Sequence, residues 1–205
     1  MKVLIVTGGI GSGKSLVCRI LTEKYRIPVY EADSRVKSLY AEVPEMLDAI
    51  EEALGVRLRD DVGTFVPRRL ADVIFTDKEA LLKVEDIIFP YLRKDFFSWA
   101  DSQLGNVVAF ESATILEKQQ FDGFGDIVLL VDAPKTLRLG RACMRDGQDE
   151  VRIKERMDAQ KLMNSLSDGA SCEKVNHKIV NDSTVDDLQR KIEKFIEKYG
   201  LTKML

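Results

Sequence analysis

The sequence has 205 residues, of which 45 % are hydrophobic and 32 % are charged. This length is enough for one or two domains with a buried core, and the composition excludes a disordered or collagen-like chain. Lys and Arg number 31 against 34 Asp and Glu, so the formal net charge is −3. We expect no nucleic-acid partner, because a protein that binds a nucleic-acid backbone is usually strongly basic.

The cysteines and the histidine exclude several kinds of site. Cys18, Cys143 and Cys172 stand far apart, which fits neither a disulfide framework nor a zinc site. His177 is the one histidine, so a mechanism with two histidines is excluded. The first apolar run is too short for a signal peptide, and no stretch approaches the about 20 apolar residues of a membrane span. We expect a soluble, cytoplasmic protein with no membrane partner; its oligomeric state is left open.

Short apolar runs alternate with helical patterns along the chain. Runs rich in Val, Ile and Leu are typical of strands covered on both faces, and their alternation with helices predicts a parallel α/β sheet. The predicted strands are 3–7, 27–30, 107–111, 127–132 and 178–180, and the plainest predicted helices are 14–25, 136–145, 149–165 and 185–199.

Residues 33–103 break this alternation. They contain only helical patterns, interrupted by a charged, loop-like segment at 55–67. A segment of this length far exceeds what a crossover between two strands needs. It predicts a helical insertion beside the sheet, which we interpret as a substrate-binding part.

A phosphate-binding motif follows the first predicted strand. Gly8-Gly9-Ile10-Gly11-Ser12-Gly13-Lys14-Ser15 matches G-x-x-x-x-G-K-[ST] and opens the helix at 14–25. Glycines let backbone N–H groups surround a phosphate, Lys14 can reach the β- and γ-phosphates, and the Ser15 hydroxyl can bind Mg²⁺. The alternative is a glycine-rich turn without a ligand. The residues expected to bind ATP are Gly9, Ile10, Gly11, Ser12, Gly13, Lys14, Ser15 and Leu16.

Among P-loop proteins, the sequence favours a small-molecule kinase. A GTPase should carry an Asn-Lys-x-Asp guanine-binding motif, and this sequence has none. Asp122-Gly123-Phe124-Gly125 matches D-x-x-G, but it precedes a strand instead of following one, so we interpret it as a turn. The chain is also short for a motor ATPase.

Three acidic residues lie at, or just beyond, the carboxyl ends of predicted strands. Asp33 can orient or deprotonate an acceptor hydroxyl and help fix hydrated Mg²⁺, or it can cap the next helix. Glu111 can hold a water of the Mg²⁺ shell, or it can bond to neighbouring backbone. Asp132 precedes Ala133-Pro134 and is interpreted as a structural helix N-cap.

Arginines recur in the region after the fourth predicted strand. Arg138, Arg141 and Arg145 have helical spacings of three and four, which places them on one face. A second helix carries Arg152 and Arg156. This pattern predicts a helical lid in which Arg141 and Arg145 stabilise charge on the transferred phosphoryl group. The alternative is a solvated, salt-bridged face.

Several further motifs follow one another in a recognisable order. They are Thr7 to Ser15, Ile27 to Asp33, Gly63-Thr64, Arg68, Ile74-Phe75, Phe89-Pro90, Ala113 to Glu117, Arg141 with Arg145, Gln160, and Ile179 to Asp182. Over nearly its whole length the sequence resembles the dephospho-coenzyme A kinase family. It departs from the family at four places: Glu31 replaces an Asp, Phe89 replaces a His, Ala113-Thr114-Ile115-Leu116-Glu117 replaces Pro-Leu-Leu-x-Glu, and Val175-Asn176 replaces Ala-Asp.

The resemblance implies a P-loop NTPase-type fold, in which a three-layer parallel sheet carries a helical substrate-binding insertion and a helical lid. Within a single kinase domain it implies a core of 1–32, 104–135 and 166–205, an acceptor-binding insertion at 33–103 and a lid at 136–165. The implied reaction is ATP-dependent phosphorylation of the ribose 3′-hydroxyl of dephospho-coenzyme A, with Mg²⁺ as cofactor. It is the last step of coenzyme A synthesis.

The resemblance also implies roles for individual residues. Lys14, Asp33, Arg141 and Arg145 are the expected catalytic residues, with Asp33 at the acceptor hydroxyl. Mg²⁺ is expected on Ser15, with Asp33 or Glu111 acting through water. Asn181 is expected near the nucleotide base. Further candidates for acceptor binding are Arg68, Glu117, Arg69, Arg35 and Lys37.

Two alternatives stay open. One is a kinase of the same architecture that phosphorylates a nucleoside monophosphate or another small alcohol. The other is a nucleotide-binding regulatory or scaffold protein that has lost its chemistry. Because pure binding has little use for an acid beside the acceptor, the presence of both Lys14 and Asp33 favours an enzyme.

Overall fold

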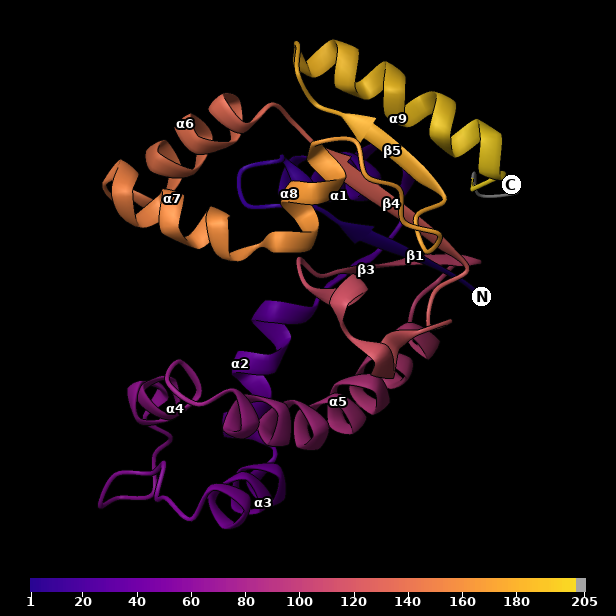
Figure 1. Ribbon diagram of the computed structural model, residues 1–205. Coiled ribbons are helices and arrows are strands. Elements are labelled where there is room, and N and C mark those ends of the chain that lie inside the picture. Colours follow the sequence, from indigo (N-terminus) through magenta and orange to yellow (C-terminus); the bar gives the residue numbers. More distant parts are fainter. Residues whose placement is uncertain (202–205) are drawn as a thin grey trace. The chain divides into compact units, whose positions relative to one another are not determined.

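The computed structural model describes residues 1–201 of the chain (Figure 1). The chain divides into two compact units, one formed by Met1–Tyr30 with Gln103–Leu205 and the other by Glu31–Ser102. None of the helices in the described part is both long and apolar enough to cross a membrane.

The first unit is built on a five-stranded sheet with the strand order β2-β3-β1-β4-β5. The strands are β1 (Lys2–Thr7), β2 (Val29–Glu31), β3 (Val107–Glu111), β4 (Ile127–Asp132) and β5 (His177–Val180). β1 pairs in parallel with β3 and β4, and β4 pairs in parallel with β5. The predicted parallel α/β sheet is therefore confirmed, and its central strands are almost fully buried, as their continuous apolar sequence indicates.

Helices α1 (Lys14–Tyr25) and α9 (Val185–Tyr199) cover one face of the sheet. Leu4 and Val6 of β1 pack there with Leu21 of α1 and Phe195 of α9. Figure 1 shows α9 running beside β5. On the opposite face, Phe110 of β3 contacts the rings of two phenylalanines from the segment that follows β3, Phe121 and Phe124. That segment contains two short 3₁₀ helices, η1 (Ile115–Glu117) and η2 (Gln119–Phe121).

Three helices lie between β4 and β5, namely α6 (Lys135–Asp146), α7 (Glu150–Ala159) and α8 (Lys161–Ser167). The single helix predicted at 149–165 is wrong, because the helix is interrupted at Gln160, whose φ and ψ are −82° and 66°. The interruption carries no glycine or proline. The break coincides with a tertiary contact, because the Gln160 side chain bonds to Ile10, which lies 150 residues away in the sequence.

The second unit consists of α2 (Ala32–Glu42), α3 (Pro44–Leu54), α4 (Pro67–Ile74) and α5 (Lys78–Asp101). Pro44 and Pro67 open their helices, where the missing N–H of proline is tolerated. The Asp77 carboxylate caps α5 by accepting hydrogen bonds from Glu79 N and Ala80 N. The predicted helical character of this part is confirmed, and the described chain adds only an isolated β-bridge between Arg59 and Phe65.

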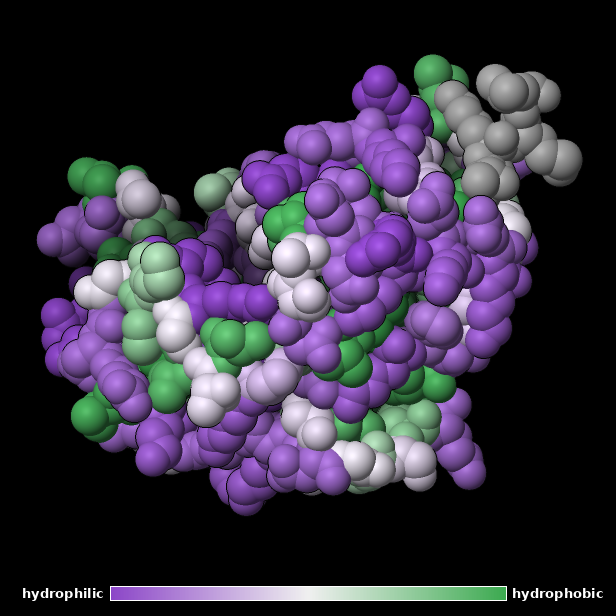
Figure 2. All heavy atoms as spheres, turned by 90° about the horizontal axis from the view of Figure 1, so that it is seen from above, coloured by the Kyte–Doolittle hydropathy of each residue, from purple (hydrophilic) through white to green (hydrophobic). Residues whose placement is uncertain are grey.

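The face of the molecule seen in Figure 2 is mainly hydrophilic, and its hydrophobic side chains form small, separate groups. Single exposed apolar residues are ordinary on a protein surface. This face therefore gives no sign of a large apolar interaction surface.

Candidate nucleotide site

The loop between β1 and α1 requires glycine for two physical reasons. Gly11 has a φ of 74°, in the left-handed region, and a Cβ there would lie 2.0 Å from the backbone oxygen of Arg138. A Cβ on Gly9 would lie 2.2 Å from Nη2 of Arg138. The loop backbone is thus in direct contact with α6.

Side chains bind three carbonyl groups of this loop. The bonds are Lys14 Nζ to Gly8 O at 2.9 Å, Arg138 Nε to Ile10 O at 3.0 Å, and Asn181 Nδ2 to Ser12 O at 3.0 Å. The loop also bonds to itself from Ser12 N to Gly9 O at 3.1 Å. Its shape is therefore fixed by the protein's own groups.

Several backbone N–H groups of the loop and the first helical turn have no hydrogen-bond acceptor in the described part of the chain. Within residues 1–201, no acceptor bonds to the N–H groups of Gly11, Gly13, Lys14 or Ser15. They lie at the N-terminus of α1, where the helix dipole favours an anion. Unbonded amides at a helix N-terminus are the kind of group that binds phosphate oxygens.

Lys14 and Glu111 form an ion pair beside these amides. The distance from Lys14 Nζ to Glu111 Oε1 is 3.7 Å, and the two side chains are 12 % and 14 % exposed. The parallel register places Glu111 opposite Val6, one residue before β1 ends. Glu111 ends β3 as predicted and contacts Lys14, and its expected role in holding a water of the Mg²⁺ shell stays a prediction.

The three arginines of α6 occupy different environments. Arg138 is 1 % exposed and also donates from Nη1 to Ser167 Oγ at 3.1 Å. Arg141 is half-buried and donates from Nη1 to the backbone oxygen of Asn181 at 3.0 Å. Arg145 is exposed, and its hydrogen bonds lower the pKa of Asp146 to about 2. Arg145 therefore lies on an exposed, salt-bridged part of α6, whereas Arg138 is buried.

Asn181 follows β5 and is 6 % exposed. Its side chain bonds to the phosphate loop, as described above, and its backbone N–H donates to Asp132 O at 2.7 Å. In this structure its side-chain amide group contacts the loop that is expected to hold phosphates.

The interpretation of Asp132 as a helix N-cap is wrong. The residue before α6 is Pro134, and no side chain caps that helix. The Asp132 carboxylate is buried and accepts hydrogen bonds from Ala133 N at 2.9 Å and Ser167 Oγ at 2.7 Å, and Lys178 Nζ lies 2.8 Å away. Burial by itself would raise the pKa of Asp132, but the bonds from Lys178 and Ser167 outweigh it, and the pKa lies below its ordinary value of 3.8.

The Asp132→Asn substitution is expected to lower the free energy of unfolding by about 2 kcal/mol at pH 7, because Lys178 loses its buried anionic partner. The folded-state pKa of Asp132 is depressed, so its stabilisation is present above pH 3.8 and disappears as the pH falls below it. Urea unfolding across this range should therefore show the difference from wild type shrinking in acid. The exposed Asp61→Asn is the control, and a difference that is independent of pH would contradict the assignment.

The residues of the helical unit that are expected to bind the acceptor differ in their exposure and in their bonding partners. Asp33 is exposed in the first turn of α2, whose N-cap is Glu31, so the alternative that Asp33 is the cap is wrong. Arg35 is partly exposed and forms ion pairs with Asp95 at 2.7 Å and Glu42 at 2.6 Å, and its expected role in acceptor binding stays a prediction.

The other basic candidates of this unit are more open. Arg68 is 89 % exposed and lies 3.9 Å from Asp72. Arg69 donates to the backbone oxygen of Arg59, and Lys37 is exposed. Glu117, which belongs to the first unit, is exposed on η1.

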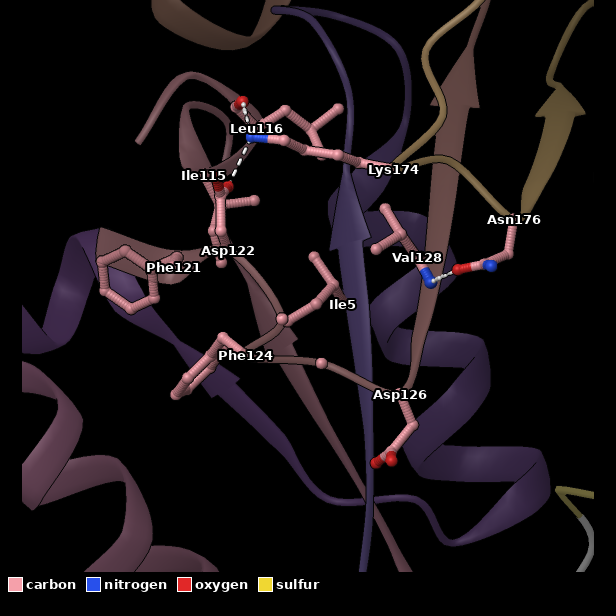
Figure 3. Close-up of a pocket in the computed structure, with 12 residues that line it drawn as sticks. Ile5, Ile115, Leu116, Phe121, Asp122, Phe124, Asp126, Val128, Lys174 and Asn176 are labelled. Carbon is pink, nitrogen blue, oxygen red and sulfur yellow. Dashed lines mark hydrogen bonds and ion pairs between the residues drawn. The ribbon is translucent and has the colours of Figure 1, made fainter. Parts of the chain in front are cut away.

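A separate pocket of about 240 Å³ lies on the sheet face opposite α1 (Figure 3). Its polar side chains already bond within the protein: Lys174 Nζ lies 2.5 Å from Asp122 Oδ1, and Asn176 Oδ1 accepts from Val128 N at 2.7 Å. Asp126 also bonds within the protein, accepting from Val3 N at 2.6 Å. Gly123, with a φ of 70°, forms a turn before β4, which confirms the interpretation of the D-x-x-G match.

Known proteins are similar to this chain in sequence and in fold. The profile of the dephospho-CoA kinase family matches residues 2–187. A dephospho-CoA kinase from Porphyromonas gingivalis is 38 % identical over 176 residues, which cover 86 % of this chain and 84 % of the relative. One from Chlorobaculum tepidum is 34 % identical over 194 residues, covering 92 % and 90 %.

Solved structures agree on the architecture. A protein from Thermus thermophilus superposes with a TM-score of 0.77 at 25 % identity, covering 96 % of this chain and 97 % of that one. A shikimate kinase from Acinetobacter baumannii superposes with a TM-score of 0.55 at 19 % identity, covering 98 % and 96 %, which is a likeness of fold. The phosphate loop, the sheet order and these matches together place the chain in the dephospho-CoA kinase family, a family of ATP-binding P-loop kinases.

Proposed function

We propose that the protein transfers the γ-phosphoryl group of ATP to the ribose 3′-hydroxyl of dephospho-coenzyme A, giving coenzyme A and ADP. The observation that carries this proposal is the group of unbonded amides around Lys14. Membership of the family supplies the identity of the acceptor.

In this proposal the phosphate loop holds the β- and γ-phosphates of ATP. The unbonded amides bind phosphate oxygens, and the Lys14 ammonium moves from Gly8 O and Glu111 to the phosphates. Arg141 and Arg145 stabilise the charge on the transferred group. Asp33 orients the acceptor hydroxyl, and a carboxylate oxygen of Asp33 takes its proton.

Mg²⁺ fits the donors that the chain offers. The described residues contain no cluster of three or more His, Cys, Asp or Glu side chains, so a divalent cation would depend mainly on phosphate oxygens and water. Mg²⁺ binds in this way, through hard oxygen donors. The hydroxyl of Ser15 and the carboxylate of Glu111 are such donors and would hold it. When bound, Mg²⁺ neutralises charge on the phosphates.

We assign acceptor binding to the helical part at 33–103 and the role of a lid to 136–165. The exposed Arg68, Arg69, Lys37 and Glu117 are candidates for contacts with the acceptor. Closure of a lid would exclude water that otherwise hydrolyses ATP.

The test is a panel of acceptors with ATP and Mg²⁺, measured as ADP formed. We expect dephospho-coenzyme A to give the highest kcat/KM. Adenosine monophosphate, cytidine monophosphate and shikimate are the comparison acceptors. A rate with one of these and none with dephospho-coenzyme A would instead identify a kinase with another substrate. No rate with any acceptor, despite ATP binding, would favour the regulatory protein.

A further inference from the structure

Ile10 of the phosphate loop is held by the α6–α8 helices at three points. Its N–H donates to Gln160 Oε1 at 2.8 Å, and its carbonyl oxygen accepts from Arg138 Nε at 3.0 Å. Its side chain packs against the apolar cluster formed by Ala142, Ile153 and Met157. Both sides of the Ile10 residue's backbone are therefore bonded to this helical region.

The position of Gln160 depends on the break between α7 and α8. The break is closed locally, because Gln160 N bonds to Met157 O at 3.0 Å and Asn164 Nδ2 bonds to the same oxygen at 2.8 Å. An uninterrupted helix would keep Gln160 in the regular helical conformation. At the interruption the Gln160 side chain takes a different direction, and its Oε1 accepts a hydrogen bond from Ile10 N of the phosphate loop.

Arg138 is held by a chain of polar contacts that begins on β5. Lys178 binds Asp132, Asp132 accepts from Ser167 Oγ, and Ser167 Oγ accepts from Arg138 Nη1. Nη2 of Arg138 is buried, has no partner among the described residues, and lies against Gly9. A buried cation is unfavourable unless its contacts compensate. An apolar side chain in place of Arg138 could not form the hydrogen bond to the phosphate loop.

We propose that Arg138 and Gln160 are positioning residues for phosphate binding, which couple the α6–α8 helices to the affinity of the loop for nucleotide. By fixing both backbone groups of Ile10, they hold the following residues in the shape that leaves the amides of Gly11, Gly13, Lys14 and Ser15 unbonded. Neither residue needs to touch the nucleotide. The inference rests on the proposed nucleotide site and deepens it, but it does not depend on the identity of the acceptor.

The Gln160→Met substitution tests the inference, because it preserves length and removes the hydrogen-bond acceptor. We expect the Kd for ADP, measured by titration calorimetry, to rise about tenfold, which corresponds to the loss of one positioning hydrogen bond. The KM for ATP should rise by a similar factor, while the KM for the acceptor changes less than about twofold. Gln148→Met, an exposed position between α6 and α7, is the matched control and should leave all three constants unchanged.

A purely structural role predicts a different result. Destabilisation would lower the fraction of active protein, and therefore kcat, without changing the Kd for ADP or the KM for ATP. An ADP Kd within about twofold of wild type in folded Gln160→Met would overturn the inference. Arg138→Lys is a second test of the inference, because lysine retains the positive charge but cannot form hydrogen bonds to both Ile10 and Ser167. ADP titration needs no acceptor, so inactivity toward dephospho-coenzyme A would contradict the proposed function and not this inference.

Discussion

Replacing Lys14 with methionine is expected to lower kcat/KM for ATP by about a thousandfold. The Lys14 ammonium is 2.9 Å from Gly8 O and only 12 % exposed, so it is a cation fixed inside the phosphate loop. Methionine has a similar length and no charge, and it leaves the Glu111 carboxylate without this cation where phosphates must bind. Initial rates of ADP formation over a range of ATP concentrations measure the effect.

The control for this substitution lies on the same helix. Lys24→Met removes an exposed lysine whose ion pair with Glu193 is 3.8 Å long, and it should change the rate by less than about twofold. A Lys14→Met enzyme that kept more than about a tenth of the wild-type kcat/KM would show that the loop does not bind the transferred phosphate through Lys14.

The Asp33→Asn substitution is expected to lower kcat about a hundredfold while leaving the Kd for ADP unchanged. Asparagine keeps the size of the side chain but cannot take the proton of the acceptor hydroxyl. Asp33 is exposed in the first turn of α2 and caps no helix, so the substitution should not unfold the unit. Asp61→Asn, in the loop before α4, is the matched control. Turnover above about a tenth of wild type would exclude the role of Asp33 as the base.

Much of the fold is predictable because the strands are buried on both faces. Leu4, Ile5 and Val6 of β1 are each at most 2 % exposed, so burial requires an unbroken apolar run, and that run is visible in the sequence. The break between α7 and α8 is different. Gln160 is an ordinary helix former, and the contact made at the break is a bond to Ile10, which no local pattern reveals.

The candidate site, like the fold, is predictable from the sequence only in part. The phosphate loop is predictable because its chemistry depends on closely spaced residues, from Gly8 to Ser15. Arg138 is not, because helical spacing places it on one face with Arg141 and Arg145 without saying what covers that face. Asp132 resembles a cap because Pro134 follows it, and its actual partners, Ser167 and Lys178, come from distant parts of the sequence.

The hydrogen bonds to the carbonyl groups of the phosphate loop affect the stage at which this loop becomes ordered. The donors and acceptors of these bonds are all groups of the chain itself, so we expect the conformational entropy of the loop to be lost during folding and not during association with ATP. A rigid receptor of this kind retains more of its contact energy as affinity. Nucleotide association should then proceed in one kinetic phase whose rate rises linearly with ATP concentration, without a slow rearrangement of the loop.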